Sequence, residues 1–200
     1  TGGKARVTLR DAVSVDLIGR YSASHAGIDG FPPPTYSFGD TKEYAQNNEL
    51  TGYAGLNVAL LDGRFLNRVG AAYTRIDRDL FDPASAPFDH YVDSTGITRR
   101  YDYQGTLDLD WASAVFGYEH ELSSFRSISY GSVTPRQRAT LDGLYGELTL
   151  KPIDGLILTG GARHDWHNRF GGATTLSASA SYTPNGGATR LRASYGEGFK

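Results

Sequence analysis

The stretch LILTGGARHDWHNRFGGATTLSASASYTPNGGATRLRASYGEGFK, residues 156–200, decides the fold. Between residues 174 and 183 the even positions are mostly apolar and the odd positions all carry a hydroxyl group: Leu176, Ala178, Ala180 and Tyr182 alternate with Thr175, Ser177, Ser179, Ser181 and Thr183. Successive residues of a β-strand point to opposite faces of a sheet. This segment is therefore predicted to separate an apolar medium from a polar one.

The composition leaves both a soluble sheet and a membrane barrel open. The chain has 200 residues, 39% of them hydrophobic, and its uninterrupted apolar runs are only a few residues long. A transmembrane helix needs about 20 consecutive apolar residues and is therefore excluded. A transmembrane barrel is not excluded, because only every second residue of each strand faces lipid.

Charge and cysteine content remove several classes of function. The net charge is −2 with no basic stripe, so we expect no nucleic-acid partner. With no cysteine there is neither a disulfide framework nor a thiolate metal site, and no cofactor is expected. The chain begins Thr1-Gly2-Gly3, without a start methionine or a signal peptide, which we interpret as an internal fragment.

Alternating segments recur along the whole chain and predict about ten antiparallel strands in an up-and-down meander. Short turns are predicted near residues 11, 62, 111, 153 and 185, and longer loops over residues 26–43, 80–98 and 127–138, with a short loop near Gly171. Outer-membrane barrels have short periplasmic turns and longer extracellular loops. The apolar medium is therefore predicted to be lipid.

Aromatic residues favour the same interpretation. Tyrosine and tryptophan gather at bilayer interfaces because the ring is apolar and its polar tip stays wet. The apolar faces of the predicted strands carry such residues, mostly toward the ends that lead into the longer loops: Tyr21, Tyr73, Tyr101, Tyr118, Trp166, Tyr182 and Tyr195.

Three motifs resemble the barrel of TonB-dependent outer-membrane receptors, and most of all the vitamin B12 receptor type. They are Gly161-Ala162-Arg163-His164-Asp165, the turn Arg169-Phe170-Gly171, and the terminal run of residues 191–200. The resemblance implies an all-β fold in which this chain is part of a 22-stranded barrel. It also implies that the plug domain, its TonB-contact segment and the closing strands lie outside the 200 residues.

The resemblance implies active transport and no enzymatic activity. The parent protein would sit in the outer membrane of a Gram-negative cell, in contact with its lipid. It would import a scarce, large solute, a cobalamin or a ferric siderophore, with energy supplied by TonB through the plug. The loops over residues 26–43 and 80–98 would help to capture the solute, since loops on a rigid scaffold usually carry recognition.

The polar face of the last strands holds the candidate site residues: Arg163, Asp165, His167, Arg169, Arg190 and Arg192. By resemblance these residues contact the plug or line the route of the solute. The alternative is a solvated wall in which neighbouring charges pair.

Other groups of residues give weaker evidence for a functional site. His164 and His167 are predicted to lie on opposite faces of a strand, so they do not share a metal ion. Five aspartates around the second loop could bind calcium, but they match no EF-hand spacing: Asp77, Asp79, Asp82, Asp89 and Asp93. There is no Gly-x-Ser-x-Gly elbow or other catalytic motif. The alternative functions are a passive porin or secretion pore, a barrel protease or lipase, and a soluble β-sandwich.

Overall fold

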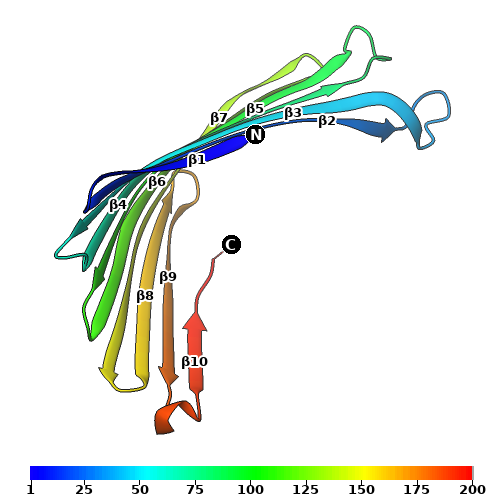
Figure 1. Cartoon of the computed structure of the whole chain (residues 1–200). Coiled ribbons are helices and arrows are strands. Elements are labelled where there is room, and N and C mark those ends of the chain that lie inside the picture. Colours follow the sequence, from blue (N-terminus) through cyan, green and yellow to red (C-terminus); the bar gives the residue numbers. More distant parts are fainter. Residues whose placement is uncertain (200) are drawn as a thin grey trace.

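The computed structural model describes residues 1–199, which form one antiparallel, ten-stranded sheet in the order of the chain (Figure 1). Its strands are β1 (Gly2–Arg10), β2 (Val13–Gly30), β3 (Gly39–Leu60), β4 (Phe65–Phe81), β5 (His90–Asp108), β6 (Ala112–Ser129), β7 (Ser132–Ile153), β8 (Leu156–His167), β9 (Gly171–Tyr182) and β10 (Leu191–Gly196). A short 3-10 turn, η1 (Asn185–Gly187), precedes β10. The predicted all-β meander of about ten strands is confirmed.

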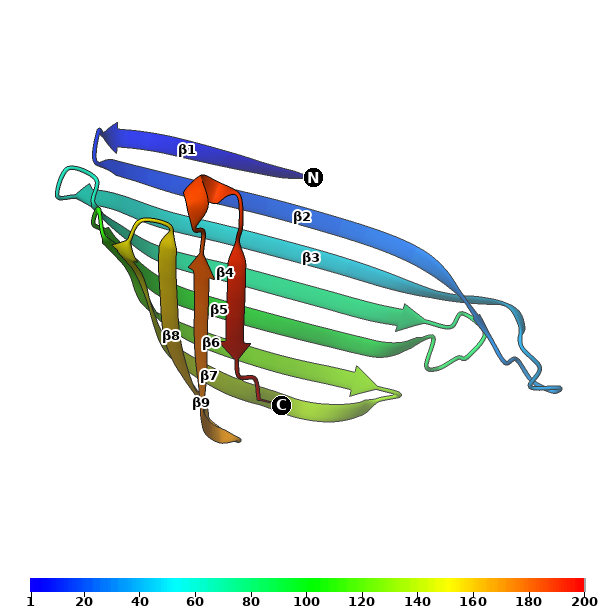
Figure 2. The same cartoon turned by 90° about the horizontal axis from the view of Figure 1, so that it is seen from below.

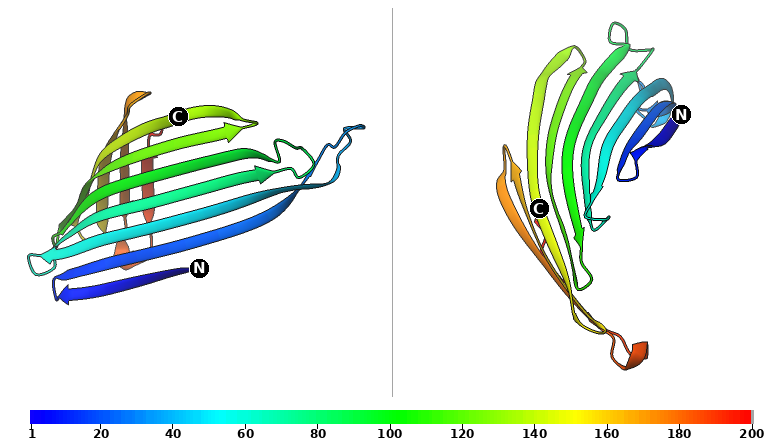
Figure 3. Two further views of the ribbon diagram at one scale, coloured as in Figure 1. Left: turned by 90° about the horizontal axis from the view of Figure 1, so that it is seen from above. Right: turned by 60° about the vertical axis from the view of Figure 1, so that its left-hand side comes forward.

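The sheet is strongly curved and not closed. Strands β8 to β10 run at a steep angle to the long strands β2 to β5 (Figures 1 and 2), and the whole sheet bends like part of a cylinder wall (Figure 3). Strands β1 and β10 are the two edges, and each pairs with one neighbour only. No helix in residues 1–199 has the length and hydropathy needed to cross a membrane.

The two faces of the sheet differ in polarity, as the alternation predicts. Strand pairing places Leu17, Ala54, Ala71 and Tyr101 in one row on the face that we call the apolar face. The opposite, polar face carries a row that includes Ser14, Asn57, Arg68, Gln104, Tyr145 and Arg163. The expected positions of His164 on the apolar face and His167 on the polar face are confirmed by their partners in β7 and β9.

The sheet has no hydrophobic core. Among residues 1–199 only two apolar side chains are buried, Ala45 and Ala112. Large apolar side chains stand exposed on the apolar face, for example Leu56 at 41% and Val69 at 53%. A soluble β-sandwich would bury such side chains against a second sheet. The single layer contradicts that alternative and leaves the apolar face to be covered by another medium.

The apolar face is apolar only over part of its height. On β4, residues from Phe65 to Tyr73 on this face are mostly apolar, and the next three are Arg75, Asp77 and Asp79. On β2 the change from apolar to polar residues on this face comes after Tyr21, and on β5 it comes between Tyr101 and Arg99. We call the apolar part the apolar band. An apolar strip edged by aromatic residues is typical of a barrel surface that faces lipid.

The predicted loops are too long, because the strands continue past the apolar band. The connection between β2 and β3 covers only residues 31–38, and that between β4 and β5 only residues 82–89. The loop predicted over residues 127–138 is wrong. Strands β6 and β7 meet there in a tight turn at Tyr130 (φ 47°) and Gly131 (φ 75°), the positive angles of a type I′ hairpin.

Extended hairpins, rather than long loops, make the two ends of the sheet different. The connection over residues 183–190, at the end with the short turns, is as long as the one over residues 31–38. The hairpins β2–β3, β4–β5 and β6–β7 project well beyond the rest of the sheet at the other end (Figure 1). Above the band both faces of these strands carry polar residues, so their hydropathy loses the period of two by which a strand is recognised.

A ladder of stacked rings crosses the projecting hairpins. Ring centroids are 4.7 Å apart for His25 and Tyr44, 4.8 Å for Tyr44 and Phe81, and 4.4 Å for Phe81 and His90. His90 Nε2 also contacts Asp79 Oδ1 at 2.9 Å. The rings belong to β2, β3, β4 and β5 in turn, so the ladder ties two hairpins together.

Replacing the central ring of this ladder should loosen the hairpins without unfolding the sheet. We expect Phe81→Ala to remove two ring contacts, each worth about 0.5–1.5 kcal/mol. Amide hydrogen exchange should then become roughly 10- to 100-fold faster in the upper parts of β3 and β4, while the band residues keep their protection. Phe65→Ala, on the same strand at the opposite end, is the matched control. Equal exchange in Phe81→Ala and the unaltered protein would contradict a stabilising role for the ladder.

Candidate functional site: the polar face

Carboxylates and glycines share one row on the polar face. Successive pairing partners in this row are Arg6, Asp16, Gly55, Gly70, Asp102, Glu119, Gly143, Asp165 and Ala173. Neighbouring strands lie about 4.8 Å apart. Acidic groups at this spacing repel each other unless cations or space separate them. Glycines separate some of the carboxylates in this row, and arginines of adjacent rows pair with Glu119 and Asp165.

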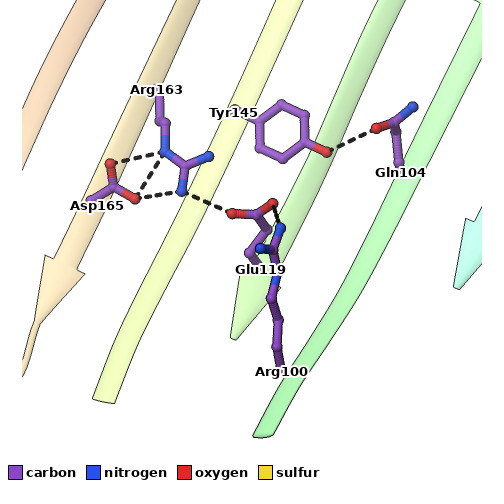
Figure 4. A network of polar contacts seen from close by, with 6 residues as sticks. All are labelled: Arg100, Gln104, Glu119, Tyr145, Arg163 and Asp165. Atoms are coloured by element: carbon purple, nitrogen blue, oxygen red, sulfur yellow. Dashed lines mark hydrogen bonds and ion pairs between the residues drawn. The ribbon is translucent and has the colours of Figure 1, made fainter. Parts of the chain in front are cut away.

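Arg163 is the centre of a charged network across three strands (Figure 4). Its Nε donates to both carboxylate oxygens of Asp165, at 3.0 and 2.9 Å, and its Nη2 donates to Glu119 Oε2 at 2.9 Å. Arg100 binds the other oxygen of Glu119. Asp165 is the one charged residue buried in residues 1–199, at 6% exposure. Burial without a paired cation would be costly, so Arg163 holds this carboxylate in place.

Two glycines make room for the network. A Cβ on Gly143 would lie 2.5 Å from Arg163 Nη2 and 2.7 Å from Asp165 Oδ1. A Cβ on Gly117 would lie 2.5 Å from the carbonyl oxygen of Tyr103. The Tyr145 ring lies beside Arg163, whose guanidinium carbon is 5.7 Å from the ring centre, and its hydroxyl donates to Gln104 at 3.3 Å. Only residues without a side chain allow this close packing at the two positions.

The first strands carry a second, more exposed set of polar contacts. Arg6 Nε pairs with Asp16 Oδ1 at 3.0 Å, and Asn57 Nδ2 donates to Asp16 Oδ2 at 2.8 Å. Arg68 Nε donates to the Tyr53 hydroxyl at 2.8 Å. Side chains on the polar face thus link β1 to β4 in one set of contacts and β5 to β8 in the other.

The six predicted site residues do not form one site. Arg163, Asp165 and His167 line a cavity of about 680 Å³ together with Phe170 and Phe199. Arg169 lies beside it, where its Nη2 donates to Gln137 Oε1 at 2.8 Å.

The other two predicted residues, Arg190 and Arg192, lie at the opposite end of the sheet, near the short turns. They line a recess of about 500 Å³ with Ser179, Ser181 and Ser194. Arg163 and Asp165 fit the alternative interpretation, in which neighbouring charges of a solvated wall pair with each other. Among residues 1–199, no carboxylate lies within 4.0 Å of Arg190 or Arg192.

The five aspartates considered for calcium do not lie together in a loop. Asp77 and Asp79 belong to β4 and Asp93 to β5, so only Asp82 and Asp89 lie in the connection. Asp77 pairs with Arg75 at 2.7 Å, and Asp79 contacts His90.

A β-bulge aims an aromatic side chain at the upper part of the polar face. Leu80 pairs with Val92, but Phe81 pairs with His90, so Tyr91 is the extra residue. Its hydroxyl donates to Glu43 Oε2 at 3.3 Å, and its ring stacks on Tyr130 at 5.2 Å. Burial raises the pKa of the Tyr91 hydroxyl, and the nearby Glu43 carboxylate adds to the rise. These groups form an aromatic rim above the band on the polar face.

Arg100, Gly143, Tyr145 and the role of Glu119 were missed by sequence reasoning. Nothing in the linear order of the sequence connects Glu119 with Arg163, which lies 44 positions away. The turns at Gly131 and Gly155 join β6 to β7 and β7 to β8, but each of these two strand pairs contains a register shift, so the turns alone do not bring Glu119 to Arg163.

The fold and the polar face together define a class of protein. A curved, single-layer antiparallel meander with an apolar band outside and an ion-paired polar wall inside is part of a transmembrane-type β-barrel. A family model described as TonB dependent receptor-like, beta-barrel, matches residues 3–200, so the chain belongs to this family of outer-membrane receptors.

One solved structure of a siderophore receptor agrees in fold with this chain. The siderophore receptor PirA from Pseudomonas aeruginosa superposes with a TM-score of 0.67 at 19% identity, over 91% of this chain and 30% of that protein. The chain therefore spans less than a third of that receptor's length. The translocator domain of the autotransporter NalP from Neisseria meningitidis gives a TM-score of 0.49 at 14% identity, over 98% and 72% of the two chains. No curated protein sequence matches the chain.

Proposed function

We propose that this chain is one section of the barrel wall of an outer-membrane receptor that imports a large, scarce solute. The observation that carries the proposal is the single-layer sheet itself, with a lipid-type band on one face and the Arg163 network on the other. Family membership gives the class of receptor. The solute is a ferric siderophore or a cobalamin, and the energy comes from TonB acting on a plug domain.

The two open edges of the sheet support completion of the barrel by further strands. In lipid an unpaired strand edge leaves its N–H and C=O groups without partners, at a cost of several kcal/mol each. Strands β1 and β10 each have one such edge. We propose that a 22-stranded barrel pairs both edges and that its plug domain lies against the polar face. The protein then acts as a receptor and transporter and not as an enzyme.

The site of solute capture is the upper part of the polar face. It includes the rim of Tyr91 and Tyr130 and, on the neighbouring strands, the cavity lined by His167 and Phe170. Aromatic rings and a few polar groups on a rigid scaffold are typical of ligand sites. The loop over residues 82–89 reaches this rim, where the Phe88 ring lies 6.4 Å from the Tyr130 ring. This loop and the one over residues 31–38 replace the longer loops that the sequence predicted.

Equilibrium binding and cell uptake test the proposal. We expect the full-length protein in detergent to bind either a ferric siderophore or cobalamin saturably. Uptake of the same compound should stop in cells without TonB while surface binding persists. Tyr91→Ala with Tyr130→Ala should weaken binding about 10- to 100-fold, because two stacked aromatic contacts are lost.

Tyr101→Ala is the matched control, since Tyr101 lies on the apolar face and should leave solute affinity unchanged. If neither a ferric siderophore nor a cobalamin binds saturably, the proposed substrates are wrong. Passive, TonB-independent passage of small solutes would instead identify a porin.

A further inference from the structure

Two arginines at the short-turn end of the polar face have no internal counter-charge. Arg192 on β10 is the pairing partner of Ser181 on β9, and Arg190 directly precedes β10. Both side chains line the recess of about 500 Å³, and both residues are exposed. Among residues 1–199, no carboxylate lies within 4.0 Å of either guanidinium group, and this includes Asp154 in the turn beside β9. Two unpaired cations in one recess attract an anionic group.

Hydroxyl side chains line much of the same recess. Ser179, Ser181 and Thr183 come from β9 and the residue that follows it, and Ser194 comes from β10. A hydroxyl group can donate a hydrogen bond to an anionic oxygen. Arginine donates through parallel N–H groups that match two oxygens of a carboxylate or a phosphate. The lining therefore fits a carboxylate or a phosphate group better than a cation or an apolar group.

A strip without charged side chains connects this recess with the cavity at Arg163. Strand β9 runs from the connection at residues 168–170 to the short-turn end, with β10 beside it (Figure 1). In the described strands β8, β9 and β10, no charged side chain stands on the polar face between Arg163 and Arg192. The side chains of this strip on β9 and β10 all carry a hydroxyl group, and we call them the hydroxyl lane: Thr175, Ser177, Ser179, Ser181 and Ser194.

The polar face of the other strands is less suited to an anionic solute. It carries carboxylates along its whole width: Asp16, Asp102, Glu119, Glu147 and Asp165. A carboxylate repels an anion, and an arginine that is already paired must give up its partner before it can bind a solute. A hydroxyl group exchanges a hydrogen bond to water for one to a solute at little net cost. In the described part of the wall, an anionic solute is therefore repelled least along the hydroxyl lane.

We propose that the recess at Arg190 and Arg192 is an anion site at the periplasmic mouth of the barrel, and that it binds a carboxylate or phosphate group of the transported solute. The short-turn end of the sheet is periplasmic in this class of barrel. The solute reaches the site along the hydroxyl lane from the cavity at His167. The inference rests on the proposed function for the direction of transport, whereas the anion site itself is testable without any transported solute.

Thiol modification of the full-length protein in detergent measures the electrostatic potential in the recess. Residues 1–200 contain no cysteine, so Ser179→Cys introduces one thiol here, in a background from which any cysteine elsewhere is removed. The probes are an anionic and a cationic methanethiosulfonate reagent of similar size, and the ratio of their rates cancels the reactivity of the thiol itself. Adding Arg190→Gln/Arg192→Gln should lower the ratio of anionic to cationic rate about tenfold, because two nearby cations attract one reagent and repel the other.

Protection by free anions tests binding at the same site. Citrate and inorganic phosphate, each at millimolar concentration, should slow the anionic reagent at the thiol of Ser179→Cys at least threefold, since an anion held by two arginines covers the recess. The same anions should have no effect once both arginines are replaced. Citrate alone would show a site for carboxylates, and phosphate alone a site for phosphates.

Ser113→Cys is the matched control, because Ser113 lies on the polar face of β6 in the same row as Ser179. Replacing both arginines should leave its rate ratio within twofold. An unchanged ratio at Ser179→Cys would overturn the proposal, because carboxylates of the parent protein, such as those of a plug domain, would then neutralise the arginines. Absence of protection by both anions would overturn it as well.

Two further measurements keep the result unambiguous. If the variant without the two arginines fails to fold, shown by its gel mobility before heating, protection of Ser179→Cys alone decides. Saturable solute binding and TonB-dependent uptake are measured separately, so a failure of the proposed function is distinguished from a failure of the anion site.

Discussion

Arg163→Ala should destabilise the barrel by about 2 to 3 kcal/mol, because it leaves the Asp165 carboxylate buried and unpaired. Arg163 forms ion pairs with both Asp165 and Glu119, and the Asp165 side chain is only 8% exposed. Equilibrium unfolding of the full-length protein in lipid, followed by fluorescence and by gel mobility, measures the loss. Arg6→Ala removes an equally short pair whose arginine is 64% exposed, and it should cost less than about 1 kcal/mol.

A double-mutant cycle separates the ion pair from other effects of the substitution. If the network acts as a unit, Asp165→Ala should cost little more in the Arg163→Ala background, because the buried charge and its partner leave together. Additive losses would show that the two side chains are energetically independent. In that case Gly143 would leave room for Arg163 and Asp165, but the contact between these two side chains would not stabilise the barrel.

Gly117→Ala should prevent or greatly slow folding of the barrel, with an expected cost of about 3 kcal/mol. The new methyl group would lie 2.5 Å from the Tyr103 carbonyl oxygen on the neighbouring strand. Backbone cannot turn away as a flexible side chain can, so strands β5 and β6 must separate locally. The yield of folded protein after refolding into detergent micelles, read from gel mobility, measures the effect.

Gly160→Ala provides the comparison, because no atom lies within 4 Å of a Cβ at that position. It should fold as the unaltered protein does. If both variants fold equally well, the close approach at Gly117 is relieved by a small shift and does not constrain the sheet. The pair of variants thus separates a packing requirement from a general intolerance of alanine in these strands.

The two faces of the sheet differ in their side chains. The Arg163 network cross-links strands of the polar face, and the cavity at His167 adjoins it. On the other side lies the apolar band, which is of the kind that faces lipid. Each side can be altered without touching the other, because alternate residues of a strand point in opposite directions.

What could be predicted from the sequence is what depends on near neighbours along the chain. The alternation in residues 174–183 correctly assigned each side chain to a face, and turn residues such as Asp62-Gly63 separated the strands and gave their number. Period and turn chemistry act over two to four residues, so no tertiary information was needed. The Gly-x-Arg-x-Asp motif likewise indicated the family before the sheet was known.

The tertiary structure decided where the strands end and which side chains of neighbouring strands meet. The hairpins above the band have polar residues on both faces, so residues 90–98 and 127–138 were interpreted as loops although the structure pairs most of them as strands. Arg163 meets Glu119 only because two hairpin registers bring residues 44 apart into adjacent rows. Register depends on all the turns and pairings together, and a local pattern in the sequence does not contain it.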